Sequence, residues 1–469
     1  MHASRFDATL IVLRLVLHIS EPNRQYSSRR KKRRLRLGTH KERTMKLTDE
    51  DKRKLDGKYG PAVQHAMEHL VKFGEAFEAE EMVDCHSAHI FSDYRTIGDG
   101  GLAFYQRLAD MGAKMGVMTT CEPISMDLKH KHEFNWPEGY EEKQNAIIDC
   151  LRRMNVVLTY TCTPYLTQNL VRFGENIAWI EGNATGFANS LIGARGNRED
   201  SVNCPMASIT KRIPKHGMLD PRNRVGSCLV KLDPELMASI GGEGAKTGDF
   251  EALGAIIGDF AYDRIPVVSG MPLGLGKEEY KALSAACSPA MTTTLLLYVG
   301  VSPEAPTLEA AFGGKVPKDI DTLYVDRKAL RRMYEDLSTT KKSKVDVVVS
   351  GCPFKTIEEI REVADLLGDR KVKSGIKFYI HTDHPTYSLA EEMGLVSRIE
   401  SAGALLTRDT CEFCMPIETM FGPEINIATD SMKMRRLVAG EGKPSWRYGT
   451  LANCVDAAVT GEFELPAWN

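Results

Sequence analysis

Apolar positions along the chain alternate between helical and strand-like spacing, which predicts an α/β protein. Helical spacing occurs at 63–82, 101–111, 141–154, 184–192, 356–367 and 386–393. Between these segments lie short apolar runs at 114–119, 156–162, 345–350, 376–381, 404–407 and 425–429. Repeated strand–helix order favours mainly parallel sheets with flanking helices. Glycines and prolines interrupt the pattern near 305–337, where we predict an internal domain boundary.

The first 44 residues differ sharply in charge from the rest of the chain. They hold 12 Lys and Arg against 3 Asp and Glu, whereas the remainder of the 469 residues carries a net charge of −11. An apolar run at 10–19 precedes the basic run at 29–36, which is the reverse of the order in a secretion signal. We interpret 1–44 as a basic leader, disordered or upstream of a true start at Met45, and 45–469 as the main body of the protein. The acidic body argues against a nucleic-acid-binding surface.

Cysteine usage indicates a reducing compartment. The chain has eleven cysteines, an odd number without regular spacing, so a disulfide framework is not expected. No apolar run reaches the roughly 18 residues that a membrane span needs. We therefore expect a cytoplasmic protein with no membrane partner, in which a few thiols are metal ligands and the others are buried apolar residues.

Three cysteines share one kind of position, at or just past the carboxyl end of a predicted strand. Cys162 ends the run 156–162, Cys352 follows 345–350, and Cys411 follows 404–407 with Cys414 close behind. Open α/β sheets bind ligands at these ends, and helices that begin there favour thiolates. Three thiolates on separate loops can hold iron or an iron–sulfur cluster and leave one coordination position open for substrate. The Cys411–Cys414 pair alone would suit zinc or redox chemistry instead.

A polar segment follows the predicted helix 184–192. Arg195 and Arg198 can clamp a carboxylate or phosphate, and Asn189 and Asn197 can fix a hydroxyl. The same pattern is also typical of the exposed basic end of a helix.

Two isolated residues are further candidates for chemistry. His89, in the sequence S-A-H, can act as a ligand or a general acid/base, or it is a hydrogen-bonded loop histidine. Lys433, after the run 425–429, can hold an anionic substrate. No G-x-G-x-x-G opens a helix after a strand, so a dinucleotide site is not predicted.

Together these segments resemble the large, catalytic subunit of the aconitase X family, from about Leu47 to Phe463. The shared landmarks are S-A-H at 87–89, T-I-G-D at 96–99, T-C-T-P-Y at 161–165, F-A-N-S at 187–190, G-A-R at 193–195, G-C-P at 351–353 and D-T-C at 409–411. The resemblance implies an aconitase-like multidomain fold and an iron-dependent hydro-lyase. Its substrate would be a small anionic hydroxy acid, phosphomevalonate in the archaeal type, whose G-C-P form this chain shares. The alternative is cis-3-hydroxy-L-proline, as in the bacterial type.

The resemblance also implies roles for individual residues. Cluster ligands map onto Cys162, Cys352 and Cys411, which would hold a 4Fe–4S cluster, with a 2Fe–2S cluster or mononuclear iron as alternatives. Substrate contacts map onto Ile90, Ser92, Asp93, Glu122, Pro123 and Lys433. His89 and Lys433 are the expected catalytic residues, and the identity of the base stays open.

The sequence departs from the family in two places. Glu122 stands where the family has Asn, and the added carboxylate would repel an anion and attract a cation, so the substrate stays open. In the family a small swivel domain, often a separate subunit, closes the site and supplies a serine as base. The chain lacks such a domain after Phe463, so we expect a heterodimer with a small swivel-domain subunit. The competing class is a non-catalytic iron–sulfur sensor whose basic leader binds RNA.

Overall fold

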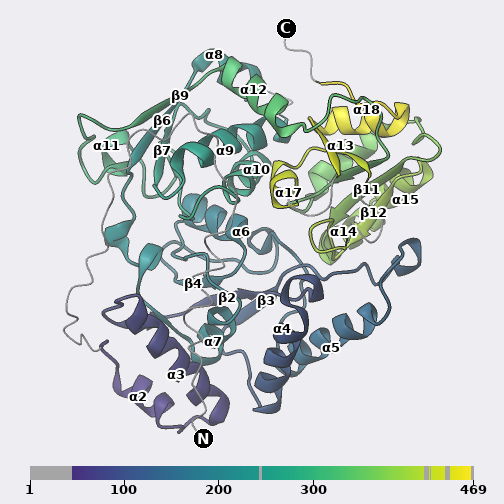
Figure 1. Cartoon of the computed structure of the whole chain (residues 1–469). Coiled ribbons are helices and arrows are strands. Elements are labelled where there is room, and N and C mark those ends of the chain that lie inside the picture. The colour runs from purple at the N-terminus through teal and green to yellow at the C-terminus, as the bar shows by residue number, and fades with distance from the viewer. Residues whose placement is uncertain (1–44, 242–245, 417–421, 423, 439–443, 466–469) are drawn as a thin grey trace, which may run out of the picture. The chain divides into compact units, whose positions relative to one another are not determined.

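The computed structural model describes residues 45–241, 246–416, 422, 424–438 and 444–465 (Figure 1). The predicted leader, 1–44, lies outside the described residues. Thr44–Asn469 forms one compact unit. The α/β prediction is confirmed, because the described strands form parallel sheets and one short antiparallel pair, with helices between them. None of the described helices is long and apolar enough to cross a membrane, and all eleven cysteines are free thiols.

The first part of the chain builds a three-stranded parallel sheet in the order β3-β2-β4 and the antiparallel pair β1-β5. Thr48 begins the first helix with a capping box to Asp51. Along β2, Ala88 and Ile90 face the core formed with α3 and α4, so His89 points to the opposite face. The elements are α2 (Asp49–Leu55), α3 (Pro61–Ala76), β1 (Met82–Asp84), β2 (Ser87–Ile90), α4 (Tyr94–Asp110), β3 (Met118–Cys121), α5 (Tyr140–Arg153), β4 (Ile177–Trp179), α6 (Gly182–Phe187), α7 (Asn203–Thr210) and β5 (Arg212–Pro214).

The middle part forms a four-stranded parallel sheet in the order β8-β7-β6-β9. Both faces are buried, because Leu229 and Val267 belong to one apolar core and Val230 and Val268 to another. Its elements are β6 (Cys228–Leu232), α8 (Pro234–Ile240), α9 (Thr247–Ala261), β7 (Pro266–Ser269), α10 (Lys277–Cys287), β8 (Leu297–Tyr298), α11 (Leu308–Ala311), β9 (Thr322–Val325) and α12 (Arg327–Leu337). Within the predicted boundary region, 305–337, β9 pairs with β6 and so belongs to this sheet.

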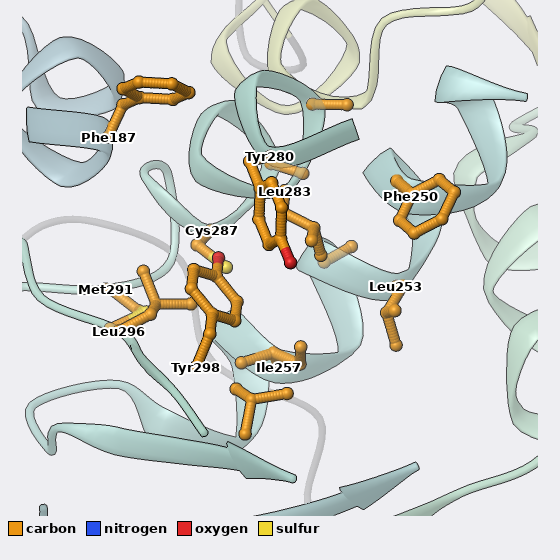
Figure 2. Close-up of a cluster of buried hydrophobic side chains, with 14 of the residues drawn as sticks. Phe187, Phe250, Leu253, Ile257, Tyr280, Leu283, Cys287, Met291, Leu296 and Tyr298 are labelled. Atoms are coloured by element: carbon orange, nitrogen blue, oxygen red, sulfur yellow. The ribbon is translucent and has the colours of Figure 1, made fainter. Parts of the chain in front are cut away.

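Helices α9 and α10 pack closely and carry much of this core, as Figure 2 shows. Gly254 makes the contact possible, since an added Cβ would lie 2.7 Å from both the Leu283 carbonyl and the Ala286 side chain. The rings of Tyr280 and Tyr298 meet edge to face with their centroids 5.1 Å apart. Full burial of each large side chain in such a core is worth about 1.5–3 kcal/mol.

The last part forms a five-stranded parallel sheet in the order β12-β11-β10-β13-β14. Val348 faces the core under α13 and α18, while Val347 and Val349 face the opposite core with Trp446. Its elements are β10 (Val347–Ser350), α13 (Ile357–Leu367), β11 (Lys377–Thr382), α14 (His384–Glu392), α15 (Leu395–Ser401), β12 (Leu405–Arg408), β13 (Asn426–Thr429), α17 (Met432–Leu437), β14 (Ser445–Tyr448) and α18 (Leu451–Thr460).

One predicted strand, 156–162, is wrong. Only an isolated bridge between Val157 and Thr120 forms there. The Thr159 hydroxyl donates to the Cys121 carbonyl, and Tyr160 adopts a positive φ of 46°, which breaks the extended ladder. The segment still runs beside the end of β3, because the Thr161 amide donates to the Cys121 carbonyl at 3.0 Å.

Candidate active site at the cysteine cluster

The three thiols predicted from strand ends meet in one buried cluster. Cys352 leaves β10 through Gly351, whose φ of 127° and missing Cβ let the chain pass the backbone of β11. Cys352 and Cys411 are neighbours, since each thiol shifts the pKa of the other. Cys162 shares an apolar cluster with Cys411, and its sulfur accepts a hydrogen bond from the Phe354 amide at 3.3 Å. Segments far apart in the sequence thus bring their thiols together.

Two loops that follow parallel strands hold the cluster from opposite sides. The Ile124 amide, after β3, donates to the Asp409 carbonyl, after β12, at 2.8 Å. The Thr161 hydroxyl donates to the Asp383 carboxylate at 2.7 Å. The cysteines therefore lie where the carboxyl end of the three-stranded sheet meets that of the five-stranded sheet, which is where α/β sheets bind ligands.

All three thiols are protonated near pH 7. Burial raises the pKa of Cys162 well above its usual range, and the Lys433 ammonium only partly opposes this effect. The neighbouring Cys411 thiol, together with burial, raises the pKa of Cys352 well above its usual range. Thiolates are the form that binds metals, so loading this site with metal would release protons.

Lys433 supplies a buried positive charge beside the thiols. It lies in α17, and its Nζ donates to Glu181 Oε1 at 2.9 Å and to Asn183 Oδ1 at 3.2 Å. Burial lowers the pKa of Lys433, but Glu181 and the neighbouring thiols raise it well above its usual range, so the ammonium is charged. Asn183 in turn donates to the Cys162 carbonyl at 3.3 Å. The ion pair is therefore attached directly to the Cys162 loop.

His89 and Glu122 form a second polar unit at this sheet end. His89 Nε2 lies 2.5 Å from Glu122 Oε1, and both side chains are buried. Burial lowers the pKa of His89 to about 3 and raises that of Glu122 well above its usual range. The imidazole is therefore neutral and the carboxyl is protonated, which places an exchangeable proton at the site near pH 7.

A hydrogen-bond chain fixes the other side of the imidazole. Trp179 Nε1 donates to the Ser87 hydroxyl at 2.8 Å, and this hydroxyl donates to Asn169 Oδ1 at 2.6 Å. Asn169 Nδ2 donates to Thr120 Oγ1 at 2.9 Å, and Thr120 Oγ1 lies 2.7 Å from His89 Nδ1. Every member is buried and partnered, so the orientation of the imidazole is fixed before any ligand binds.

The other predicted substrate-contact positions after β2 and β3 are held against one another. The Glu122 amide donates to the Ile90 carbonyl at 2.9 Å, and the Ser92 hydroxyl donates to the Glu122 and Pro123 carbonyls. Asp93 begins α4 as its N-cap, accepting from the Thr96 amide at 2.8 Å. Burial raises the pKa of Asp93 to about 6. Ser92 is therefore a support for the loop, whereas Asp93 adds a second carboxyl close to the thiols.

The polar segment 193–199 divides between two surroundings. It runs beside β4, with Arg195 opposite Asn176 and Arg198 opposite Trp179. Residues three apart in an extended segment point to opposite faces, so the two arginines do not form a clamp. Arg198 packs over Gly182, next to Glu181, and is the arginine adjacent to the site.

Asn189 and Asn197, both predicted to bind substrate, form hydrogen bonds with other parts of the protein. Asn189 donates to the Gly196 and Thr294 carbonyls at 2.8 and 2.7 Å and accepts from the Gly196 amide at 2.9 Å. Asn197 lines an open cavity of about 460 Å³ together with Arg198, and it bonds to the His216 segment. Neither side chain is directed at the cysteine cluster by these bonds.

Comparison with known proteins identifies the family. Three family models match consecutive parts of the chain: aconitase X first domain at 44–221, second domain at 226–335 and third domain at 345–460. The chain is 34% identical over 393 residues to the phosphomevalonate dehydratase large subunit of Methanothermobacter thermautotrophicus, covering 83% of this chain and 93% of the relative. The chain belongs to the aconitase X family. The resemblance recognised from the sequence motifs is thereby confirmed.

Other aconitase X relatives extend the comparison. The cis-3-hydroxy-L-proline dehydratase of Pseudomonas aeruginosa is 30% identical over 422 residues, covering 89% of this chain and 71% of the relative. The crystal structure of Thermococcus kodakaraensis aconitase X in its holo-form superposes with a TM-score of 0.77 at 29% identity, covering 88% of this chain and all of that one. Several relatives are named large subunits, which implies a small-subunit partner.

Membership of this family points to an iron–sulfur cofactor, and the donor set suits one. The cysteine cluster offers several soft sulfur donors. The hydrogen bond from the Phe354 amide to the Cys162 sulfur is of the kind that tunes the reduction potential of an iron–sulfur cluster. Next to Cys411, the Thr410 hydroxyl and Glu412 Oε1 are buried without a hydrogen-bond partner among the described residues. Among the same described residues, no three His, Cys, Asp or Glu side chains are placed so that they could hold a single metal ion. A cluster differs in this respect, because it offers each thiolate its own iron.

Sequence reasoning missed several residues of the site. Glu181 and Asn183, which hold Lys433, carry no recognisable motif. His381 and Glu412 repeat the arrangement of the first sheet, since His381 Nε2 lies 2.8 Å from Glu412 Oε2 and its Nδ1 lies 2.5 Å from Thr407 Oγ1. A signal for this repeat exists in the dipeptide Cys-Glu, which occurs at the end of β3, at 121–122, and after β12, at 411–412.

Proposed function

We propose that the chain is the large subunit of an iron–sulfur dehydratase that removes water from a small anionic hydroxy acid. The observation that carries the proposal is the meeting of Cys162, Cys352 and Cys411 beside the buried Lys433–Glu181 pair. These three thiols would hold the cluster, a 4Fe–4S cluster in the simplest case. When bound, the cluster would act as a Lewis acid toward the hydroxyl that leaves.

Lys433 would bind the anionic part of the substrate. An ammonium has three donors, and two of them are directed at Glu181 and Asn183. Burial strengthens its electrostatic attraction for a carboxylate or phosphate. Arg198, packed over Gly182 beside the same Glu181, would extend this positive region toward solvent. The arrangement orients an anion relative to the thiols.

Glu122 and His89 would handle a proton at this site. Because Glu122 is protonated and in contact with a neutral imidazole, the pair can deliver a proton to a leaving hydroxyl and regain it afterwards. The fixed imidazole keeps the carboxyl in place. The base that removes the proton from carbon would come from a small swivel-domain subunit, with which the chain would form a heterodimer.

Phosphomevalonate is the substrate we propose first. Relatives named phosphomevalonate dehydratase large subunit are 34% and 32% identical and are covered over more than nine-tenths of their length. The G-C-P sequence at Cys352 agrees with this assignment.

A second candidate is cis-3-hydroxy-L-proline, and one observation favours it. Glu122 brings a carboxyl to the position where the family has Asn, and a carboxyl oxygen can accept a hydrogen bond from a substrate ammonium group. Relatives with this named activity match at 30% identity.

The test is anaerobic iron and sulfide analysis of the chain co-expressed with its small subunit, followed by dehydration assays on both substrates. Cys352→Ser should lose iron, sulfide and turnover together. Full activity of this variant would refute the ligand assignment. Deleting residues 1–44 should leave turnover intact, whereas a sensor with an RNA-binding leader would lose nucleic-acid affinity and show no turnover at all.

A further inference from the structure

A fourth thiol lies within the cysteine cluster. Cys414 Sγ is 3.7 Å from Cys411 Sγ, and both belong to the same buried apolar cluster as Cys162. Its side chain is 5% exposed. Cys352 interacts electrostatically with both Cys411 and Cys414.

The backbone holds Cys414 toward this cluster. The segment after β12 turns as in a helix, with the Cys414 and Met415 amides donating to the Cys411 carbonyl at 2.9 and 3.0 Å. Arg95, from α4, donates to the Phe413 carbonyl and also lies 5.8 Å from the centre of the Phe413 ring. An element of the first domain thus fixes the turn that carries both thiols.

The other groups near Cys411 are less suited to bind iron. The Glu412 carboxyl is in contact with His381 at 2.8 Å. Glu122 is in contact with His89 at 2.5 Å. Thiolate is also the softer ligand, which iron–sulfur chemistry favours over carboxylate.

We propose that Cys414 is a fourth cluster ligand in the substrate-free protein, an inference that rests on the proposed iron–sulfur function. Its thiol would lose a proton on binding iron, closing the position that three cysteines leave open. Substrate oxygens would then displace it, and the departing thiolate would take up a proton from solvent. Cys414 would thereby protect the exposed iron between turnovers.

The test compares wild-type protein, Cys414→Ser and the control Cys150→Ser after anaerobic reconstitution with iron and sulfide. Cys150 is also buried, but it lies in α5 and packs in the separate core of the first domain. Iron and sulfide are counted, one oxidising equivalent of ferricyanide is added, and electron paramagnetic resonance is recorded. Wild type and control should retain their iron and give no three-iron signal. Cys414→Ser should lose iron and give that signal, and a chelator should remove its iron about tenfold faster or more.

Wild-type protein provides a second measurement that does not depend on how the variant folds. Added phosphomevalonate should increase the rate of iron removal from wild type, because it displaces Cys414. If oxidised wild type gives the three-iron signal as readily as Cys414→Ser, Cys414 is not a ligand although the cluster is real. If none of the proteins incorporates iron and sulfide, the proposed function itself falls.

Discussion

A buried ionic network beneath the cysteine cluster gives the sharpest prediction for stability. Lys281, from α10, is 2% exposed and donates to the Phe354 carbonyl at 2.8 Å and to the Glu359 carboxylate. Lys355 pairs with Asp430 at 2.7 Å and lies 3.8 Å from Glu359. Two ammonium groups thus balance two carboxylates within the core.

The protonation states support this balance. Burial would raise the pKa of Glu359, but Lys281 and Lys355 together lower it, so the carboxylate is charged. Burial lowers the pKa of Lys355, yet Asp430 and Glu359 raise it above its usual range. Glu251, whose pKa burial raises well above normal, stays neutral and accepts from the Met432 amide. Removing one ammonium would therefore leave one uncompensated negative charge.

Lys281→Met should destabilise the chain strongly, since breaking one partner of a buried ion pair costs about 3–5 kcal/mol. Lys281→Met with Glu359→Gln should recover most of the loss, because the network is neutral again and Gln retains the capping box with Thr356. Lys277→Met is the matched control on the same helix. Its pair with Glu358, 3.4 Å apart and about half exposed, is worth about 0–1 kcal/mol.

The assay is urea unfolding followed by the fluorescence of the buried Trp446 and Trp179. With a slope of about 1–3 kcal/mol per molar urea, Lys281→Met should lower the midpoint by about 1–5 M, and Lys277→Met should barely move it. Equal midpoints for Lys281→Met and wild type would refute the reasoning. A double variant as unstable as the single one would show that charge imbalance is not the cause.

Three further predictions follow from individual contacts. Gly182→Ala should displace the Arg198 guanidinium, which occupies the space of the added Cβ. Steady-state kinetics should then show a higher KM for the anionic substrate, and iron analysis should show little change in iron content. An unchanged KM would exclude Arg198 from substrate binding. Asp93 has a pKa of about 6 in the folded chain against a usual 3.8. Its protonated form therefore stabilises the folded chain at low pH, and this contribution to the free energy of unfolding is lost as the pH rises through 6. Asp93→Asn, which keeps the N-cap, should gain about 1–2 kcal/mol on wild type between pH 5 and pH 7 in urea unfolding, and parallel pH profiles would contradict this. Glu122→Gln should lower kcat by about 10²–10⁴-fold at unchanged cluster content if Glu122 handles a proton, and full kcat would remove it from that role.

The fold was predictable where strands are buried on both faces. The runs 345–350, 376–381, 404–407 and 425–429 became β10 to β13, because continuous apolar runs suit central parallel strands. The run 156–162 looks equally apolar, but the Thr159 hydroxyl and the positive φ at Tyr160 divert its backbone. Side-chain-to-backbone bonds of this kind leave no periodic trace in the sequence.

The site was predictable in its thiols and in the isolated candidates His89 and Lys433, but not in the residues that hold them. Strand-end position marked Cys352 and Cys411, because parallel sheets place such residues at one edge. Glu181 was not predictable, because its role depends on Lys433, 252 residues later, reaching it in space. The structural role of Asn189 was not predictable either, because its hydrogen-bond partners Gly196 and Thr294 come close to it only in the folded chain.

The two Cys-Glu dipeptides show why motifs alone cannot name ligands. In each sheet a histidine on one strand faces a threonine on the next, His89 with Thr120 and His381 with Thr407, and contacts the following glutamate. Cys121 is the last residue of β3, and strand alternation turns it into the core of the first domain. Cys411 lies three residues beyond the end of β12, where alternation no longer applies, and turns into the cluster. The distance from the strand end therefore decides whether the same dipeptide supplies a core thiol or a thiol of the cysteine cluster.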